Sequence, residues 1–436
     1  MEMTELTALL TPEGLRLLDQ VGTVSSTAEV AQTVSQLRAA GHSPELVSGV
    51  VGQAHLRAKG AAKFGGFAER MLFTRAGLEQ ATRLGVAARH AGRMRRAGIE
   101  TVADLGCGIG GDSLAFAGAG LRVRAVDADD VTAAIAAYNL APFGASGSPS
   151  ERDDPRGSFS DRDDSRGSLS ERSETKRAER PQGIEASVTV QHGTAEDFDV
   201  TGVDAVWLDP ARRTAGHSET RRVAASDYSP SLDWAFALAE RVPTGIKLGP
   251  AHDRDALPAD AEAQWVSADG SVVELVVWSG VLAREGVRRA ALVIRGDQSY
   301  ELTAGADAED AEVGELGAFV HEPDGAVIRA RLIGDVARSL EAGMLDEKIA
   351  YLTGDAAVTS PFVQSFRVRE VTAANPKAIN AALRRADVGT LEIKKRGMDI
   401  DPAAFRKKLN LPGEASATLI LTRVGDRRIA ILADRV

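Results

Sequence analysis

The sequence predicts an α/β protein in which a doubly wound, mostly parallel sheet lies between a helical N-terminal region and a small α+β module. Over residues 1–97 apolar residues recur every three or four positions, as amphipathic helices require. Over 98–296 short apolar segments alternate with helix-like segments, which is typical of a parallel sheet covered by helices. Over 362–436 shorter strand-like and helix-like segments alternate and end in two expected strands.

The N-terminal region has recognisable helix starts. Ser26 or Thr27 is expected to cap one helix, because a side-chain oxygen there can accept a backbone N–H of the first turn. Ser43-Pro44-Glu45 predicts the start of another, since proline suits the first helical position. Further helices rich in Ala and Arg are expected before the first strand.

The central domain is expected to contain seven strands and one insertion. The strands are 102–105, 123–126, 188–190, 205–208, 246–248, 272–278 and 290–294, the last two after a turn at Asp269-Gly270. A charged ten-residue repeat fills much of 144–183, which carries too few apolar groups to offset the entropy of ordering. We interpret 144–183 as a disordered insertion. It would be either a solvated tether or a contact to RNA through its arginines.

Residues 297–361, which contain an acidic run, are interpreted as a connecting subdomain before the C-terminal module. The whole chain has a net charge of −10, yet 362–436 carries 15 Lys and Arg against 8 Asp and Glu. A basic module on an acidic body favours a polyanionic partner such as nucleic acid. A basic surface without a partner is the alternative.

Composition excludes several classes of protein. Cys107 is the single cysteine, so neither an intrachain disulfide nor a multi-thiolate metal site can form. No two of the 7 histidines are spaced i, i+4, which excludes a zinc site of the H-E-x-x-H kind. No apolar run approaches the ~20 residues of a membrane span, and the acidic N-terminus lacks the features of a signal peptide. We therefore expect a cytoplasmic protein that binds neither a metal nor a membrane.

A glycine-rich segment, Asp104–Asp112, follows the first strand and begins a helix. Its glycines permit a tight turn and let the backbone approach a ligand closely. Asp104 precedes them, where a carboxylate can orient the loop and meet an ammonium group. Asp127 ends the next strand about 20 residues on, where ribose hydroxyls would bind. Domains that bind NAD share this second acid but lack the acid of the D-x-G-x-G form.

With these residues the sequence resembles the class I S-adenosylmethionine (SAM)-dependent methyltransferases. Asp104–Asp112 matches their first motif, Arg124–Asp127 their second and Asp204–Pro210 their fourth. The stretch His192–Asp197 is similar to the third motif, with Thr194 where an acid is usual, so that Glu196 or Asp197 would substitute near adenine. The resemblance implies a Rossmann-like methyltransferase sheet that binds SAM. The implied cofactor-binding residues are Asp104, Gly106, Gly108, Gly110, Asp127, Ala195, Glu196 and Asp209.

Within that class, the first motif, Ala137-Tyr138-Asn139 and the fourth motif resemble nucleic-acid base methyltransferases, trimethylguanosine synthase among them. In those enzymes the fourth motif holds the target amino group and an aromatic residue stacks on the flipped base. This chain has Asp209-Pro210-Ala211-Arg212-Arg213 and lacks the second proline and the aromatic residue. The Asp-Pro-x-Arg form is also similar to the uridine C5-methyltransferases. They need a cysteine nucleophile, and Cys107 lies in the cofactor loop, so we reject that chemistry.

The overall layout resembles a bacterial family of methyltransferases with a THUMP-like C-terminal domain. The matching stretches are Leu78–Thr82, the Asp-Pro-Ala-Arg-Arg run, Glu322–Asp324 and Leu391–Gly397. THUMP domains generally bind RNA, so the resemblance implies an RNA substrate, either tRNA or rRNA. Gln80 and Thr82 would line the cofactor cleft or else lie on the surface.

Several candidate residues keep two interpretations. Asp209, beside Pro210, would orient or receive the proton of the methyl acceptor, or would cap a turn at the end of a strand. Arg212 and Arg213 would clamp a phosphate of the substrate, or pair with acids on neighbouring loops. Tyr228 would supply the missing stacking face, or pack within its loop. The basic run that would contact RNA phosphates, or else form a solvated face, is Lys394, Lys395 and Arg396.

The main hypothesis is a SAM-dependent enzyme that methylates a base nitrogen in structured RNA, with Asp209, Pro210 and Arg212 as catalytic residues. A methyltransferase of proteins or small molecules is the second, and it predicts no salt-sensitive binding of RNA. A non-catalytic RNA-binding protein that keeps the fold is the third, and it predicts no binding of SAM. The oligomeric state does not follow from the sequence.

Overall fold

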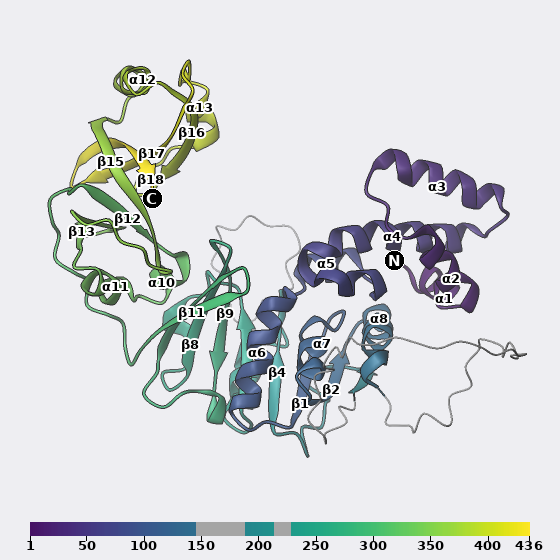
Figure 1. Ribbon diagram of the computed structural model, residues 1–436. Helices are drawn as coiled ribbons and strands as arrows, with labels where there is room; N and C mark the ends of the chain where they lie inside the picture. The colour runs from purple at the N-terminus through teal and green to yellow at the C-terminus, as the bar shows by residue number, and fades with distance from the viewer. Residues whose placement is uncertain (145–187, 213–227) are drawn as a thin grey trace, which may run out of the picture. The chain divides into compact units, whose positions relative to one another are not determined.

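The computed structural model describes residues 1–144, 188–212 and 228–436 (Figure 1). The expected insertion over 144–183 lies outside the described residues except for Gly144, and Arg213 lies outside them as well. The chain divides into two compact units, Met1–Val206 and Trp207–Val436, and the division falls within strand β4.

The first unit begins with helices, as the sequence predicts. Helices α1, α2 and α3 lie around the long helix α4 (Figure 1), and their apolar side chains form a core with Val50 and Phe73. The side-chain oxygen of Ser26 caps α3 and that of Ser43 caps α4, which confirms both predicted starts. The helices are α1 (Met3–Leu9), α2 (Pro12–Val21), α3 (Thr27–Ala39), α4 (Pro44–Phe64), the 3-10 helix η1 (Gly65–Arg70), α5 (Arg75–Gln80) and α6 (Leu84–Arg96).

Parallel strands and two helices follow in this unit. Strand β1 is buried along its whole length, Thr101 and Asp104 included, and it pairs in parallel with β2. Strand β2 pairs in parallel with β3, so β1, β2 and β3 end at the same edge of the sheet. The elements are β1 (Thr101–Leu105), α7 (Gly111–Gly118), β2 (Arg122–Asp127), α8 (Asp130–Leu140), the 3-10 helix η2 (Ala141–Phe143), β3 (Val188–His192) and β4 (Ala205–Leu208).

The second unit carries further strands, in the order β11-β10-β8-β9-β7. Strands β8 and β9 form a hairpin about Asp269 and Gly270, which have φ of 51° and 80°. The elements are β5 (Ala211–Arg212), β6 (Tyr228–Ser229), α9 (Leu232–Ala239), β7 (Thr244–Leu248), β8 (Glu262–Ala268), β9 (Ser271–Trp278), β10 (Arg289–Arg295) and β11 (Gln298–Ala304), with 3-10 helices at Arg254–Ala256 and Gly280–Leu282.

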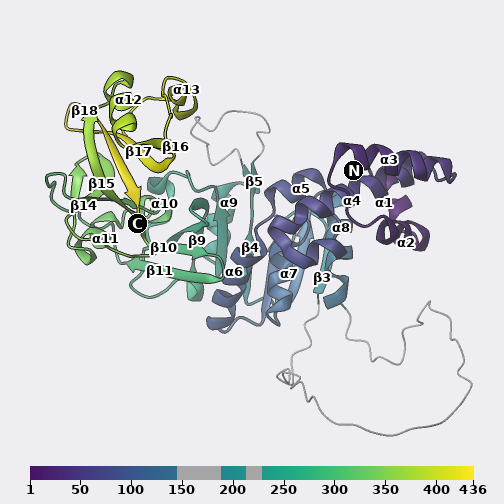
Figure 2. The same cartoon turned by 45° about the horizontal axis from the view of Figure 1, so that its top comes forward.

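A second sheet, with the order β13-β14-β12-β15-β18-β17-β16, completes this unit. Helices α12 and α13 cover one of its faces (Figure 2), over a core that includes Leu383 and Leu419, while Tyr351 and Phe366 belong to a separate core. The elements are β12 (Phe319–Pro323), α10 (Gly325–Arg329), α11 (Ile333–Ser339), β13 (Gly343–Asp346), β14 (Ile349–Gly354), β15 (Val363–Ala373), α12 (Pro376–Arg385), β16 (Val388–Lys395), α13 (Pro402–Arg406), β17 (Ala415–Val424) and β18 (Arg427–Arg435).

The sheets extend past two of the expected boundaries. Strand β11 continues the central sheet beyond residue 296, and β12, β13 and β14 share one sheet with residues 363–435. The expected division at 361/362 thus lies inside a seven-stranded sheet. In the described part of the chain, no helix combines the length and the apolarity that crossing a membrane requires.

Candidate functional site

The glycine-rich loop joins β1 to α7 and has an unusual backbone. Gly106, Gly108 and Gly110 have φ of 85°, 57° and 85°, a left-handed region that costs any residue with a Cβ about 1–2 kcal/mol. The amides of Gly106 and Cys107 donate to the carbonyl of Val126 in β2, at 2.9 and 3.0 Å. The loop is therefore held against the end of the neighbouring strand in one conformation.

Two carboxylates stand at this loop, as the sequence predicts. Asp104 is buried in β1, and its Oδ2 accepts a hydrogen bond of 2.5 Å from the hydroxyl of Ser113 in α7. Asp127 accepts from the amide of Gly108 at 2.9 Å and from the amide of Asp129 at 3.0 Å. Burial raises the pKa of Asp127, while these two amides act in the opposite direction. Asp127 thus fixes the loop at its second glycine.

Cys107 lies in the loop as a buried free thiol. Burial, followed by the charges of Asp104 and Asp127, raises the pKa of this thiol well above its usual range. A thiol rather than a thiolate is present near neutral pH, and a thiol is a poor nucleophile. The rejection of a cysteine-dependent mechanism agrees with this environment.

The third motif follows β3 and is tied to β2. The amide of Gly193 donates to the carbonyl of Asp127 at 3.0 Å, and Ala195 is buried. Thr194, which replaces the usual acid, donates from its hydroxyl to Asp197 at 2.7 Å. Glu196 is exposed. The roles of Ala195 and Glu196 toward a cofactor stay predictions.

A buried polar network connects the N-terminal helices to the first turn of α7. The carboxylate of Asp112 accepts from the hydroxyl of Thr82 at 2.7 Å and lies 3.0 Å from Nδ1 of His90 in α6. Asn139 in α8 bridges similarly, since its Nδ2 donates to the carbonyls of Leu72 and of Ile109, at 3.0 and 2.9 Å. The helical region therefore braces the cofactor loop.

Sequence reasoning missed most of this network. Thr82 was a candidate for the cleft, and it is buried beside the loop. The sequence did not identify His90 as a candidate site residue, because a single histidine among Ala and Arg in a helix matches no known motif. Only the structure shows that Thr82 and His90 meet at Asp112.

In the second unit Asp209 directly follows β4. It forms an ion pair with Lys247 of β7, and 34% of its side chain is exposed against 13% for Lys247. Pro210 is buried. Arg212 lies in β5, where it pairs with Tyr228 of β6, but its side chain is outside the described residues, as is all of Arg213. Lys247 is a residue that sequence reasoning did not identify.

Tyr228 is buried, with 2% of its surface exposed. Its ring lies edge-on to the ring of His252, with the two centroids 6.2 Å apart. The expected stacking on a base stays a prediction.

The three cations at the end of β16 differ in their surroundings. Lys394 donates to Glu322 of β12 at 2.6 Å, and Arg396 lies 3.5 Å from the other carboxylate oxygen of Glu322. Both cations also lie over aromatic rings, Lys394 over Phe366 and Arg396 over Tyr351. Lys395 is exposed. Contact of these three residues with RNA stays a prediction.

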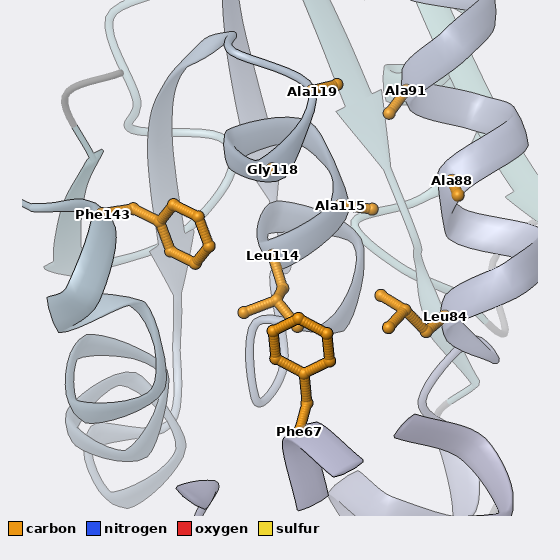
Figure 3. Close-up of a pocket in the computed structure, with 9 residues that line it drawn as sticks. All are labelled: Phe67, Leu84, Ala88, Ala91, Leu114, Ala115, Gly118, Ala119 and Phe143. Atoms are coloured by element: carbon orange, nitrogen blue, oxygen red, sulfur yellow. The ribbon is translucent and has the colours of Figure 1, made fainter. Parts of the chain in front are cut away.

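A surface pocket of about 280 Å³ lies away from these motifs. Figure 3 shows Leu84, Ala88 and Ala91 of α6 opposite Leu114 of α7, with Phe67 and Phe143 at its margin. Its lining side chains are apolar and carry no group that would bind an ammonium, a carboxylate or a ribose. This pocket does not suit SAM.

The loop between β1 and α7 does suit SAM. A Cβ added at Gly108 would meet no heavy atom within 4 Å, so the space beside the loop is open. The amides of Gly106, Cys107 and Gly108 are already bonded to β2, which leaves Asp127 and the loop in a fixed arrangement. The described residues contain no group of three or more His, Cys, Asp or Glu that could hold a metal ion.

Comparison with family models matches two parts of the chain. Residues 363–435 match the THUMP domain-like family, and residues 2–60 match a domain of unknown function (DUF8688). The first match coincides with β15 to β18 and their helices. A THUMP-like C-terminal domain is therefore confirmed.

Known proteins resemble the chain over most of its length. It is 30% identical to the uncharacterized SAM-dependent methyltransferase Rv3037c of Mycobacterium tuberculosis H37Rv, over 81% of this chain and 85% of that protein. The crystal structure of a protein of Porphyromonas gingivalis W83, assigned as a methyltransferase, has the same fold. It covers 95% of this chain and 99% of its own, with a TM-score of 0.66 and 19% identity. By its close relative and its motifs, the chain belongs to the SAM-dependent methyltransferases.

Proposed function

We propose that this enzyme transfers the methyl group of SAM to a nitrogen of a base in structured RNA, either tRNA or rRNA. The observation that carries the proposal is the pairing of a methyltransferase with a THUMP-like module whose residues 362–436 hold 15 Lys and Arg against 8 Asp and Glu. An excess of cations on one module is the electrostatic footprint of a polyanion-binding surface.

Each candidate residue has a role in this proposal. Asp127 would bind the ribose of SAM, and Asp104 with the three glycines would position its methionine part. Ala195 and Glu196 would lie near adenine. Bound SAM supplies a methyl group on a positively charged sulfur, so the protein has mainly to orient the acceptor. Asp209, with Pro210 and Arg212 beside it, would hold the acceptor, and the substrate-binding residues would be Arg213, Tyr228, Lys394, Lys395 and Arg396.

The basic surface would act mainly through its exposed cations. Lys394 and Arg396 already share the carboxylate of Glu322, so a phosphate would have to compete for them. Lys395 is exposed and alternates with them along β16. We therefore assign the larger part of phosphate binding in this run to Lys395. Contacts of this kind hold RNA by its backbone and shape rather than by its sequence.

Mass spectrometry of nucleosides tests the proposal in cells. RNA is prepared from cells with the gene, without it, and without it but carrying the Asp209→Ala variant. We expect one methylated nucleoside to be lost with the gene and to stay absent with the variant. An unchanged set of nucleosides across tRNA and rRNA would contradict an RNA substrate and favour a protein or a small molecule.

A further inference from the structure

Lys247 is the single charged residue of β7, and its side chain is only 13% exposed. The other residues of the strand, Thr244, Gly245, Ile246 and Leu248, are buried. The ammonium of Lys247 pairs with the Oδ2 of Asp209, the residue that follows β4. A lysine in such a strand therefore places its charge at the candidate acceptor site.

The surroundings of Lys247 are rigid. Trp207 of β4 and Trp278 of β9 pack against each other, with ring centroids 5.7 Å apart. A methyl group added at Gly245 would come within 2.7 Å of Trp278 and 2.8 Å of Trp207. The absence of a side chain at Gly245 thus lets two large rings close over β7, two residues before Lys247.

Stability alone does not account for this pair. The carboxylate of Asp209 is about one-third exposed, and an ion pair that water still reaches contributes about 0–1 kcal/mol to stability. A charged pair at the end of a strand, where ligands of open α/β sheets bind, suits a functional role.

We infer that Lys247 is a positioning residue for methyl transfer, which holds the carboxylate of Asp209 oriented toward a neutral acceptor that carries a hydrogen. This inference rests on the role proposed above for Asp209. An opposite charge favours the ionised form of a carboxylate, and an ion pair at a fixed lysine restricts its rotation. A carboxylate can only accept hydrogen bonds, so the chemistry favours an amino group, which carries a hydrogen to donate, over a carboxylate, a thiolate or a phosphate.

The transfer balances in this arrangement. The lone pair of the acceptor nitrogen forms a bond to the methyl carbon, while the bond from that carbon to sulfur breaks and its electron pair stays on sulfur. The nitrogen then releases its proton to the carboxylate of Asp209, and from there to water. Lys247 keeps its own proton throughout and acts only through Asp209.

Variants of Lys247 test the inference with tritium-labelled SAM. The acceptors are the RNA, the protein and the small-molecule fractions of a lysate from cells that lack the gene. We expect Lys247→Met to lower kcat by roughly 10- to 100-fold, the usual cost of removing a partner that orients a site residue. Lys247→Arg should restore part of that loss. Lys59→Met, in the exposed part of α4, is the matched control and should keep kcat within twofold.

Three further readouts separate positioning from folding. Lys247→Met should keep the melting temperature and the Kd for SAM, measured by calorimetry. Lys247→Ala should regain activity with added ethylammonium but not with tetramethylammonium, which has no N–H to donate. A crystal structure of Lys247→Met should show the Asp209 carboxylate turned from its place beside residue 247.

Unchanged kcat in Lys247→Met would overturn the inference, and so would a loss explained wholly by weaker SAM binding or by unfolding. Failure of the RNA proposal would appear separately. If the label enters the protein fraction and resists ribonuclease, RNA is not the substrate, and the same variants compared on that fraction still decide the role of Lys247. Absence of label in every fraction with the unmodified enzyme would overturn both.

Discussion

Gly108, in the loop between β1 and α7, is needed both for its backbone conformation and for its hydrogen bond to Asp127. Its φ is 57°, which favours glycine, and its amide donates to Asp127 at 2.9 Å. The space beside it is open, so that a ligand rather than protein would occupy it. We therefore expect cofactor binding at this loop to depend on the backbone conformation of the glycines.

Gly108→Ala should weaken SAM binding roughly 5- to 30-fold, since about 1–2 kcal/mol of strain falls on the loop that is proposed to hold the cofactor. Gly120→Ala is the control, because Gly120 also has a positive φ, 83°, and open space, but it lies in the turn between α7 and β2. Calorimetry with SAM measures both. Equal Kd values for the two variants would contradict a cofactor role of the loop.

The sequence predicted the residues of this loop because a motif is local. Asp104, the glycines and Asp127 belong to one strand-loop-helix-strand unit whose spacing is visible in the chain. Lys247 and His90 could not be predicted in the same way. Each meets its carboxylate only after separate elements pack, β7 beside Asp209 and α6 beside Asp112.

At the scale of elements, the start of α7 is where the helical region meets the cofactor loop. Thr82 donates to Asp112 within a buried network, whereas Thr132 donates to Asp129 at the exposed start of α8. Thr82→Val should lower the free energy of unfolding by about 1–3 kcal/mol, because a buried acceptor loses its donor. Thr132→Val should cost less than about 0.5 kcal/mol. Urea unfolding measures both free energies, and equal losses in the two variants would contradict the inference that Thr82 braces the start of α7.

His321 in β12 predicts a dependence of stability on pH. It is buried, its Nδ1 lies 2.9 Å from the hydroxyl of Ser365, and burial lowers its pKa below the ordinary value of 6.5. The unfolded chain therefore binds a proton more readily than the folded one. Its contribution to stability is complete above pH 6.5 and is lost as the pH falls from there toward the folded pKa.

His321→Gln should reduce the fall in stability at low pH. The measurement is the melting temperature between about pH 7 and pH 5. Phe319→Leu removes the ring that stacks on His321 but keeps the histidine, so the slope should persist. An identical slope in His321→Gln and the unmodified protein would show that another group is responsible.

Most strands were predictable, and the exceptions have a physical reason. The predicted strands β4, β9 and β10 are largely apolar and are buried along most of their length, while β1 and β2 carry apolar residues between polar or charged ones. Strand β8 was not predicted although it is wholly buried, because it carries Glu262, Gln264 and Ser267. Glu262 is satisfied there by Arg284 at 2.6 Å, a partner beyond the next strand. A buried polar residue whose partner lies far away in the sequence produces no local sequence pattern from which the strand could be predicted.

At the scale of the whole molecule, charge is separated along the chain. The total is −10, while residues 362–436 carry 15 cationic and 8 anionic side chains. An acidic body repels RNA and a basic module attracts it, so binding should be directed to the module. Its strength should fall steeply with salt, as release of counterions requires.

Lys395→Glu should weaken binding of total tRNA and reduce the slope of log K against log salt by about 1. Lys59→Glu, the same change of charge on α4 in the other unit, should leave both nearly unchanged. Filter binding at several salt concentrations measures the binding constant and its salt slope for each variant. Equal effects of the two variants would contradict a binding surface on the THUMP-like module.

The most direct measurement is transfer of label from methyl-tritiated SAM to purified RNA. The RNA comes from cells that lack the gene, so that its target site is unmethylated, and the enzyme is compared with Asp209→Ala. We predict that the unmodified enzyme labels one nucleoside on a base nitrogen and that the variant binds SAM but labels none. RNA that stays unlabelled, while protein or small molecules from the same cells take up the methyl group, would contradict an RNA substrate.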